Sequence, residues 1–180
     1  MESKDRYIHL SKKKIIKLLD KEQNKTPSEQ PKGLWFAKEK KWINFIDKNT
    51  SKEVTGNIYL VKLNFPVVKK MKEEDKNKIL KIGTQKALDK FIEKYNVNHK
   101  IDWMKVSENN AGVLFEPYFY NQQMHPHKYK WYSTLDIPSG CIWNKEAASI
   151  ELIQEYKKPE KKKVRFDFEE NKNFNKLLLS

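Results

Sequence analysis

Apolar residues along this chain recur with the spacing of short strands and helices. The clearest strand pattern is residues 56–65, where Ile58 and Leu60 alternate with other residues and Pro66 ends the segment. Strands are expected in the apolar or alternating segments 6–11, 34–37, 56–65, 79–82, 111–120, 139–144 and 148–156. The chain therefore contains many short strands separated by loops of varied length.

Helices are expected where apolar residues return at every third or fourth position. Residues 85–95 carry such a face, and Thr84 stands before them as a candidate N-cap. The segments 12–23 and 38–49 show the same periodicity, and 101–108 suits one or two helical turns. Because strands and helices mix without a regular βαβ rhythm, the predicted fold class is α+β.

The last part of the chain has a different character from the rest. Residues 157–180 are dense in charge, first basic and then mixed, and suggest a tail outside the core. The predicted organisation is one globular domain at 1–156 and a charged C-terminal tail at 157–180. A length of 180 residues is enough for one domain with a real core.

Among the features of composition, the net charge says most about possible partners. The formal net charge of +13 favours anionic partners such as nucleic acid or phosphorylated ligands. Lysine enrichment is equally compatible with a solvating surface, so both interpretations stay open. No helix-turn-helix or zinc-finger spacing is visible, and no lysine run alternates with regularly spaced aromatic residues.

The cysteine count and the apolar runs bear on location. Cys141 is the single cysteine, which excludes a disulfide within the chain and suits a reducing compartment. The first ten residues lack a signal-peptide pattern, and no run approaches the roughly 20 apolar residues of a membrane span. An intracellular protein, cytoplasmic or nuclear and without a membrane partner, is expected.

The stretch PKGLWFAKEKKWINFI, residues 31–46, raises the question of function. A tryptophan, Trp35, follows a glycine turn at the end of a short strand. Trp42, Phe45 and Ile46 then share one helix face. These aromatic residues serve either ordinary core packing or a platform for a flat ligand.

Three patches of the chain resemble motifs of the ADP-ribosyltransferase family. Residues 33–37 and Trp42 resemble the family's glycine turn, aromatic strand end and following helix. YIHLS, residues 7–11, resembles the first motif, with leucine in place of its glycine, and 139–156 resembles the closing strands. The resemblance implies an ADP-ribosyltransferase-like fold with two small mixed or antiparallel sheets and flanking helices, and NAD⁺ as the bound substrate.

The same resemblance implies a role for each matched residue. His9 would hydrogen-bond the ribose, Ser11 would support the ribose or the carboxamide, and the Leu10 backbone would bind the carboxamide. Trp35 or Trp42 would stack on the cationic nicotinamide ring, because an aromatic face attracts a cation. Breaking the bond between ribose and nicotinamide passes through an oxocarbenium-like state, as in glycoside hydrolysis.

The sequence departs from the family at its catalytic glutamate. Ser139 or Gly140 stands at that position, and Ser139 is grouped with the cofactor-binding candidates, while Asp136 is the nearest preceding carboxylate. Glu116 and Glu146 are further alternatives. Three outcomes stay open: Asp136 substitutes as a catalytic residue beside His9, the protein only binds a nucleotide, or the fold serves another purpose. Enzyme activity, as a mono-ADP-ribosyltransferase, is therefore left undecided.

Each of these residues also has a structural interpretation. His9 suits a partly buried strand histidine, Trp35 and Trp42 suit core aromatics, and Asp136 suits a turn or cap residue. Cys141 suits a small buried hydrophobe. A cavity lined by His9, Trp35 and a carboxylate would favour the functional interpretation over the structural one.

A second resemblance lies in the tail. KKVRFDF, with Lys163, Val164 and Phe166, resembles the docking motif of protein phosphatase 1 partners, which adds a strand with two apolar anchors. The basic run before it also resembles a nuclear localisation signal. The alternative function is therefore a non-enzymatic protein that binds nucleic acid or a phosphatase through its basic surface and tail.

Overall fold

The computed structural model describes residues 6–49, 55–69, 76–124 and 130–157. The strands are β1 (Tyr7–Ser11), β2 (Leu34–Lys38), β3 (Thr55–Leu63), β4 (Val67–Val68), β5 (Ile79–Ile82), β6 (Asn96–Val97), β7 (Lys100–Ile101), β8 (Gly112–Phe115), β9 (Ser139–Ile142) and β10 (Ala148–Lys157). The helices are α1 (Glu39–Asn49), α2 (Gln85–Tyr95) and α3 (Trp103–Asn109), with short 3-10 turns η1 (Tyr120–Met124), η2 (Tyr132–Leu135) and η3 (Lys145–Ala147).

One large sheet dominates the described residues, so the predicted α+β fold with two small sheets is wrong. Eight strands form a curled sheet in the order β10-β3-β1-β2-β9-β8-β5-β4, and β6 with β7 forms a small hairpin. The strands expected in separate sheets are joined because β9 pairs through four residues with β2 and through four with β8. The fold is therefore dominated by strands, with three α-helices in the described ranges.

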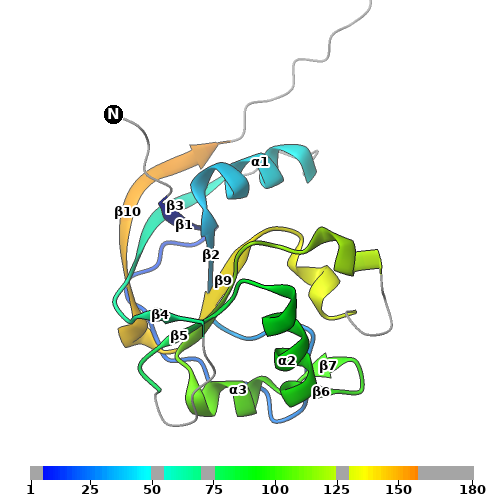
Figure 1. Cartoon of the computed structure of the whole chain (residues 1–180). Coiled ribbons are helices and arrows are strands. Elements are labelled where there is room, and N and C mark those ends of the chain that lie inside the picture. Colours follow the sequence, from blue (N-terminus) through cyan, green and yellow to red (C-terminus); the bar gives the residue numbers. More distant parts are fainter. Residues whose placement is uncertain (1–5, 50–54, 70–75, 125–129, 158–180) are drawn as a thin grey trace, which may run out of the picture.

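The sheet buries a different apolar cluster on each face. The face that carries Trp35, Val113 and Cys141 is covered by α2, α3 and η2, whose aromatic residues complete the larger cluster. We call this the helical face, and Figure 1 shows α2 and α3 next to each other, apart from α1. The opposite face carries Phe36 and Leu114 and a smaller cluster. Strand alternation accounts for the division, since successive side chains point to opposite faces.

The helices follow the periodicity that predicted them. Helix α2 spans the expected residues, and its N-cap is Thr84, whose hydroxyl oxygen accepts a hydrogen bond from the Ala87 N–H at 3.1 Å. Leu88, Phe91, Ile92 and Tyr95 are its buried residues, as their spacing predicted. Helices α1 and α3 also form where a helix was expected.

The helix expected at 12–23 is absent, and this segment is an extended loop. Ile15 and Leu18 are partly buried, whereas Ile16 is 92% exposed. The Ile15 N–H donates to the Tyr59 hydroxyl at 2.7 Å, and the Lys21 N–H donates to the Trp143 carbonyl at 2.8 Å. Backbone N–H groups of this loop therefore donate hydrogen bonds to Tyr59 and Trp143, and not to carbonyl groups within a helix.

The junction between β1 and β2 is the narrowest pairing in the middle of the sheet. β1 pairs with β3 over five residues but with β2 only at Tyr7–Lys38 and Ile8–Ala37. Beyond this point the His9 side chain, rather than the β1 backbone, bonds the Trp35 carbonyl. The two strands therefore separate beside His9, and we call this junction the seam.

None of the helices in the described part of the chain is long and apolar enough to cross a lipid bilayer. The same residues contain no group of three or more His, Cys, Asp or Glu side chains arranged to hold a metal ion.

Candidate functional site

A cavity of about 360 Å³ lies beside the seam, bounded by β1, β2, α1 and the segment from η2 to β9. Its lining mixes aromatic rings with a few polar groups. It consists of His9, Leu10, Gln30, Trp35, Phe36, Trp42, Phe45, Thr134, Leu135, Asp136, Ile137 and Ser139. This volume is within the range of small-ligand sites.

Six of the residues singled out from the sequence line this one cavity: His9, Leu10, Trp35, Trp42, Asp136 and Ser139. They come from three distant segments of the chain. A cavity lined by His9, Trp35 and a carboxylate is the arrangement that would favour a ligand site over a packing role. The roles suggested for these residues remain predictions.

His9 lies at the seam with its orientation fixed by the backbone. Its Nδ1 is 2.6 Å from the Trp35 carbonyl oxygen, and because a carbonyl only accepts, Nδ1 carries the proton and donates. Burial lowers the pKa of His9 by disfavouring the imidazolium, and the hydrogen bond to Trp35 opposes part of this shift. The ring is therefore neutral at pH 7, and its Nε2 is left as an acceptor.

Helix α1 contributes an aromatic wall. Trp42 and Phe45, three residues apart, stack with ring centroids 6.0 Å apart and an interplanar angle of 6°. Ile46, on the same helix face, is buried. The Trp42 Nε1–H is buried and has no hydrogen-bond acceptor among the described residues, which costs free energy.

Asp136 occupies the rim in an unusual backbone conformation. Its φ of 34° lies in the left-handed region, and the Ile137 N–H donates to the Leu135 carbonyl across it. The carboxylate is exposed and makes no hydrogen bond or ion pair with any described residue, so the expected cap bond is missing. Such local strain is common where a side chain has to be presented to a ligand.

The other candidates lie elsewhere. Ser11 does not line the cavity, and its hydroxyl donates to the Lys13 carbonyl at 2.7 Å. Cys141 is fully buried, and burial raises the pKa of its thiol, which argues against a nucleophile. Glu146 is exposed in η3, away from the lining residues. Lys163, Val164 and Phe166 fall outside the described residues.

Gln30 and Thr134 also line the cavity, but no pattern in the sequence indicated them. Gln30 belongs to a loop without periodicity, yet its Nε2 donates to the Thr134 carbonyl at 2.9 Å and closes one side of the cavity. Thr134 in turn belongs to a short 3-10 turn. The long-range contact between Gln30 and Thr134 is fixed by tertiary structure alone.

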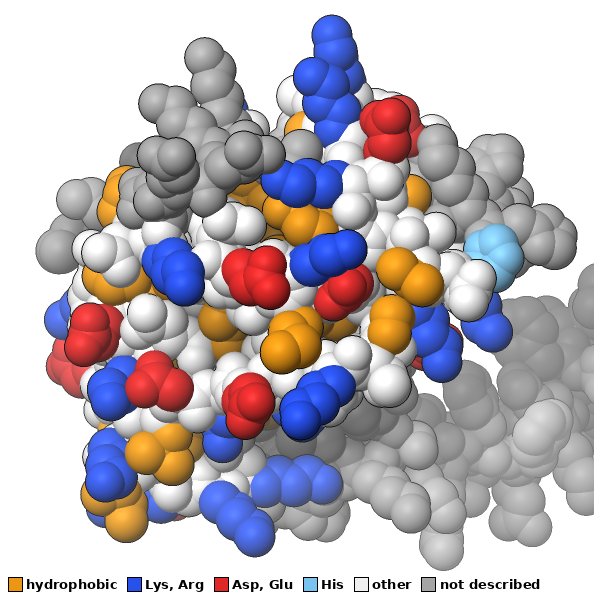
Figure 2. Space-filling model, turned by 90° about the horizontal axis from the view of Figure 1, so that it is seen from below, with side chains coloured by type: hydrophobic (Ala, Val, Ile, Leu, Met, Phe, Trp, Pro, Cys, Tyr) orange, Lys and Arg blue, Asp and Glu red, His pale blue; other side chains and the backbone are white. Residues whose placement is uncertain are grey.

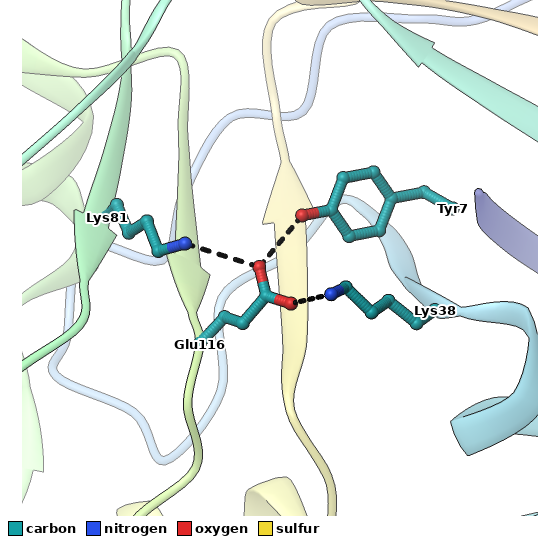
Figure 3. A network of polar contacts seen from close by, with 4 residues as sticks. All are labelled: Tyr7, Lys38, Lys81 and Glu116. Carbon is teal, nitrogen blue, oxygen red and sulfur yellow. Dashed lines mark hydrogen bonds and ion pairs between the residues drawn. The ribbon is translucent and has the colours of Figure 1, made fainter. Parts of the chain in front are cut away.

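A second polar cluster gathers around Glu116, just after β8. Its two carboxylate oxygens lie 2.8 Å from Lys38 Nζ and 3.4 Å from Lys81 Nζ, and the Tyr7 hydroxyl donates to it at 2.9 Å (Figure 3). Burial alone would raise the pKa of Glu116, but the hydrogen bonds from Lys38 and Tyr7 and the charges of both lysines lower it. The cluster joins four strands of the sheet at one end.

Replacing Glu116 with glutamine is expected to lower the free energy of unfolding by about 1–3 kcal/mol at pH 7, because two ammonium groups lose their shared anion. The pKa of Glu116 is lower in the folded protein than in the unfolded chain. Its stabilisation is therefore present above the unfolded pKa and lost as the pH falls through the folded one. Urea unfolding across this range should show the variant approaching wild type below about pH 4.5.

Glu151→Gln is the matched control, because Glu151 pairs with Lys62 at 3.0 Å while both side chains are 61% exposed. Its effect should be within about 0.5 kcal/mol. A Glu116→Gln penalty that persists unchanged into acid would contradict the electrostatic account.

Comparison with known proteins gave no match for this chain among family models, curated proteins or solved structures.

Proposed function

We propose that the cavity beside the seam binds the nicotinamide and ribose of NAD⁺, and that the protein is an ADP-ribosyltransferase or a weakened, NAD-binding relative of one. The proposal depends on one observation: His9, two tryptophans and a carboxylate line a single cavity although they are far apart in sequence. It does not depend on the fold, which differs from the one that the resemblance implied.

The cavity's groups suit the parts of such a ligand. The Trp42 and Phe45 wall, or the Trp35 ring, offers an aromatic surface for the flat nicotinamide. His9 Nε2 would accept a hydrogen bond from a ribose hydroxyl, since Nδ1 is already engaged. A volume of about 360 Å³ suits one half of a dinucleotide, so the phosphates and adenosine would lie outside.

Transfer would break the bond between ribose C1′ and the nicotinamide nitrogen, which keeps the electron pair and leaves as neutral nicotinamide. An acceptor would then bond to C1′ and release its proton. Asp136 is the carboxylate of the cavity, and its negative charge would stabilise the oxocarbenium-like sugar. The acceptor would be a protein or a nucleic acid.

Titration calorimetry with NAD⁺ tests the proposal. Trp42→Leu should weaken binding about tenfold, because stacking of a ring on an aromatic side chain contributes about 1–3 kcal/mol. Tyr120→Leu is the matched control, since Tyr120 is 54% exposed and lies outside the cavity lining. Failure of wild-type protein to bind NAD⁺ at millimolar concentration would remove the proposal.

The alternative of a nucleic-acid or phosphatase partner has less support. On the face in Figure 2, acidic side chains lie between the lysines, so no continuous basic surface forms there. The phosphatase-like motif lies outside the described residues. An intracellular location, cytoplasmic or nuclear, would suit both NAD⁺ and a free, buried Cys141 thiol.

A further inference from the structure

The cavity beside the seam has an unusual charge for this protein. The chain contains 37 Lys and Arg residues and has a formal net charge of +13. No lysine or arginine is among the described residues that line this cavity, and Asp136 is its carboxylate. The neighbouring cavity across the seam, which His9 also lines, contains Lys17 and Lys21. The lysines that are frequent elsewhere in the chain are therefore absent from the described lining of the first cavity.

His9 does not offset the charge of Asp136. Its Nδ1–H is bonded to the Trp35 carbonyl, and burial favours the neutral ring. The described lining thus carries one formal negative charge, from a carboxylate that has no partner within the described ranges.

The remaining walls attract positive charge as well. Trp35, Trp42 and Phe45 supply aromatic rings, and the negative face of such a ring attracts a cation, most strongly for indole. A quaternary nitrogen has no proton to donate, so ring faces and one carboxylate are sufficient partners for it. A phosphate or carboxylate ligand would find no cationic side chain among the described lining residues.

We infer that this cavity selects a positively charged, alkylated nitrogen, an N-alkylpyridinium or a quaternary ammonium, over a neutral group of the same shape. The inference concerns the site of the proposed function and names its ligand class, yet it requires no nucleotide. It assigns Asp136 a role in binding: the carboxylate, held at the rim by its left-handed backbone, sets the charge preference. For NAD⁺ it means preference for the oxidised, cationic ring over the neutral dihydropyridine of NADH.

The test uses two probes of the same shape. The N-methylnicotinamide cation, methylated on its ring nitrogen, and 3-methylbenzamide carry the same carboxamide and methyl groups at the same ring positions. They differ in one ring atom, which is a charged nitrogen in the first and a neutral carbon in the second. Calorimetry or ligand-observed NMR on the full chain should give about tenfold tighter binding of the cation. Equal affinities, or tighter binding of 3-methylbenzamide, would overturn the inference.

Asp136→Asn removes the charge and keeps a residue that tolerates the left-handed region. It should reduce cation affinity several-fold and leave the affinity for 3-methylbenzamide unchanged. Glu22→Gln is the control, because Glu22 is exposed and lines a different cavity. If Asp136→Asn still prefers the cation, the assignment of the charge preference to Asp136 is overturned. If this variant does not fold, the affinities of the wild-type protein for the two probes still decide the inference.

Failure of the inference and failure of the proposed function give different results. Binding of the N-methylnicotinamide cation without binding of NAD⁺ would support the inference and remove the proposed function. Binding of NAD⁺ and NADH with equal affinity would support a dinucleotide site and overturn the inference.

Discussion

Replacing Phe91 with alanine should cost about 3–5 kcal/mol of the free energy of unfolding, the usual range for a buried aromatic residue. Phe91 has no exposed surface and is at the centre of the larger apolar cluster. Its ring centroid lies 5.0 Å from Tyr95, 5.9 Å from Trp103, 6.0 Å from Phe115 and 5.8 Å from Trp131. The substitution therefore leaves a cavity where α2, α3, η2 and the sheet meet.

Urea denaturation monitored by far-UV circular dichroism measures this effect. A total stability of about 5–15 kcal/mol is typical, so the variant should unfold at much lower urea concentration, or be unfolded without it. Lys90→Ala, on the exposed side of α2 next to Phe91, is the matched control and should change stability by less than about 0.5 kcal/mol. A Phe91→Ala loss below about 1 kcal/mol would contradict the packing described for this cluster.

Gly140→Ala should destabilise the protein strongly, although it adds a single methyl group. A Cβ at Gly140 would lie 2.3 Å from Phe36 Cζ, 2.7 Å from Phe36 Cε1 and 2.8 Å from the Val113 carbonyl oxygen. The Phe36 ring is 1% exposed and has little room to move. Overpacking of this kind costs about 1–3 kcal/mol or more, and thermal unfolding should reveal it.

Two comparison variants isolate the cause. Gly83→Ala places its Cβ 3.1 Å from the Glu116 carbonyl oxygen and 3.5 Å from Lys81 Cε, so its penalty should be much smaller. Phe36→Leu combined with Gly140→Ala should lose less stability than the sum of the single changes, because the smaller side chain relieves the clash. Strict additivity would show that Phe36 is not the obstacle.

Local patterns in the sequence were sufficient to predict most elements. Helix α2, its Thr84 cap and strand β5 form at the residues where periodicity predicted them. The assembly of the strands could not be predicted in the same way. β9 lies between β2 and β8 through pairs such as Trp35–Cys141 and Val113–Cys141, which join residues far apart in sequence. Periodicity determines which face a residue occupies but does not identify its partner strand.

The loop at 12–23 shows how tertiary contacts override a local preference. Its apolar spacing suits a helix, yet Ile15 and Leu18 turn toward the sheet and the Tyr59 hydroxyl accepts the Ile15 N–H. A hydrogen bond to a residue more than forty positions away has no signature in the local sequence.

The candidate site was predictable in part. His9, Trp35, Trp42 and Asp136 were selected through motif resemblance, and the cavity brings them together. The hydrogen bond from Gln30 to Thr134, which closes one side of the cavity, was not predictable, because it depends on where two irregular segments meet. The cluster of Glu116 with Lys38, Lys81 and Tyr7 was missed for the same reason, since its members come from four different strands or strand ends.

The seam is a narrow point in the backbone pairing of the large sheet. Only two residue pairs connect β1 to β2, whereas β1 and β3 share five and β3 and β10 share nine. A three-stranded block and a five-stranded block thus share few backbone pairs at the seam, and the His9 bond to Trp35, the Tyr7 bond to Glu116 and the smaller apolar cluster also connect them. A molecule held between His9 on one block and Trp35 or Asp136 on the other would act as a cross-link between them. Its binding energy would then oppose separation of the two blocks.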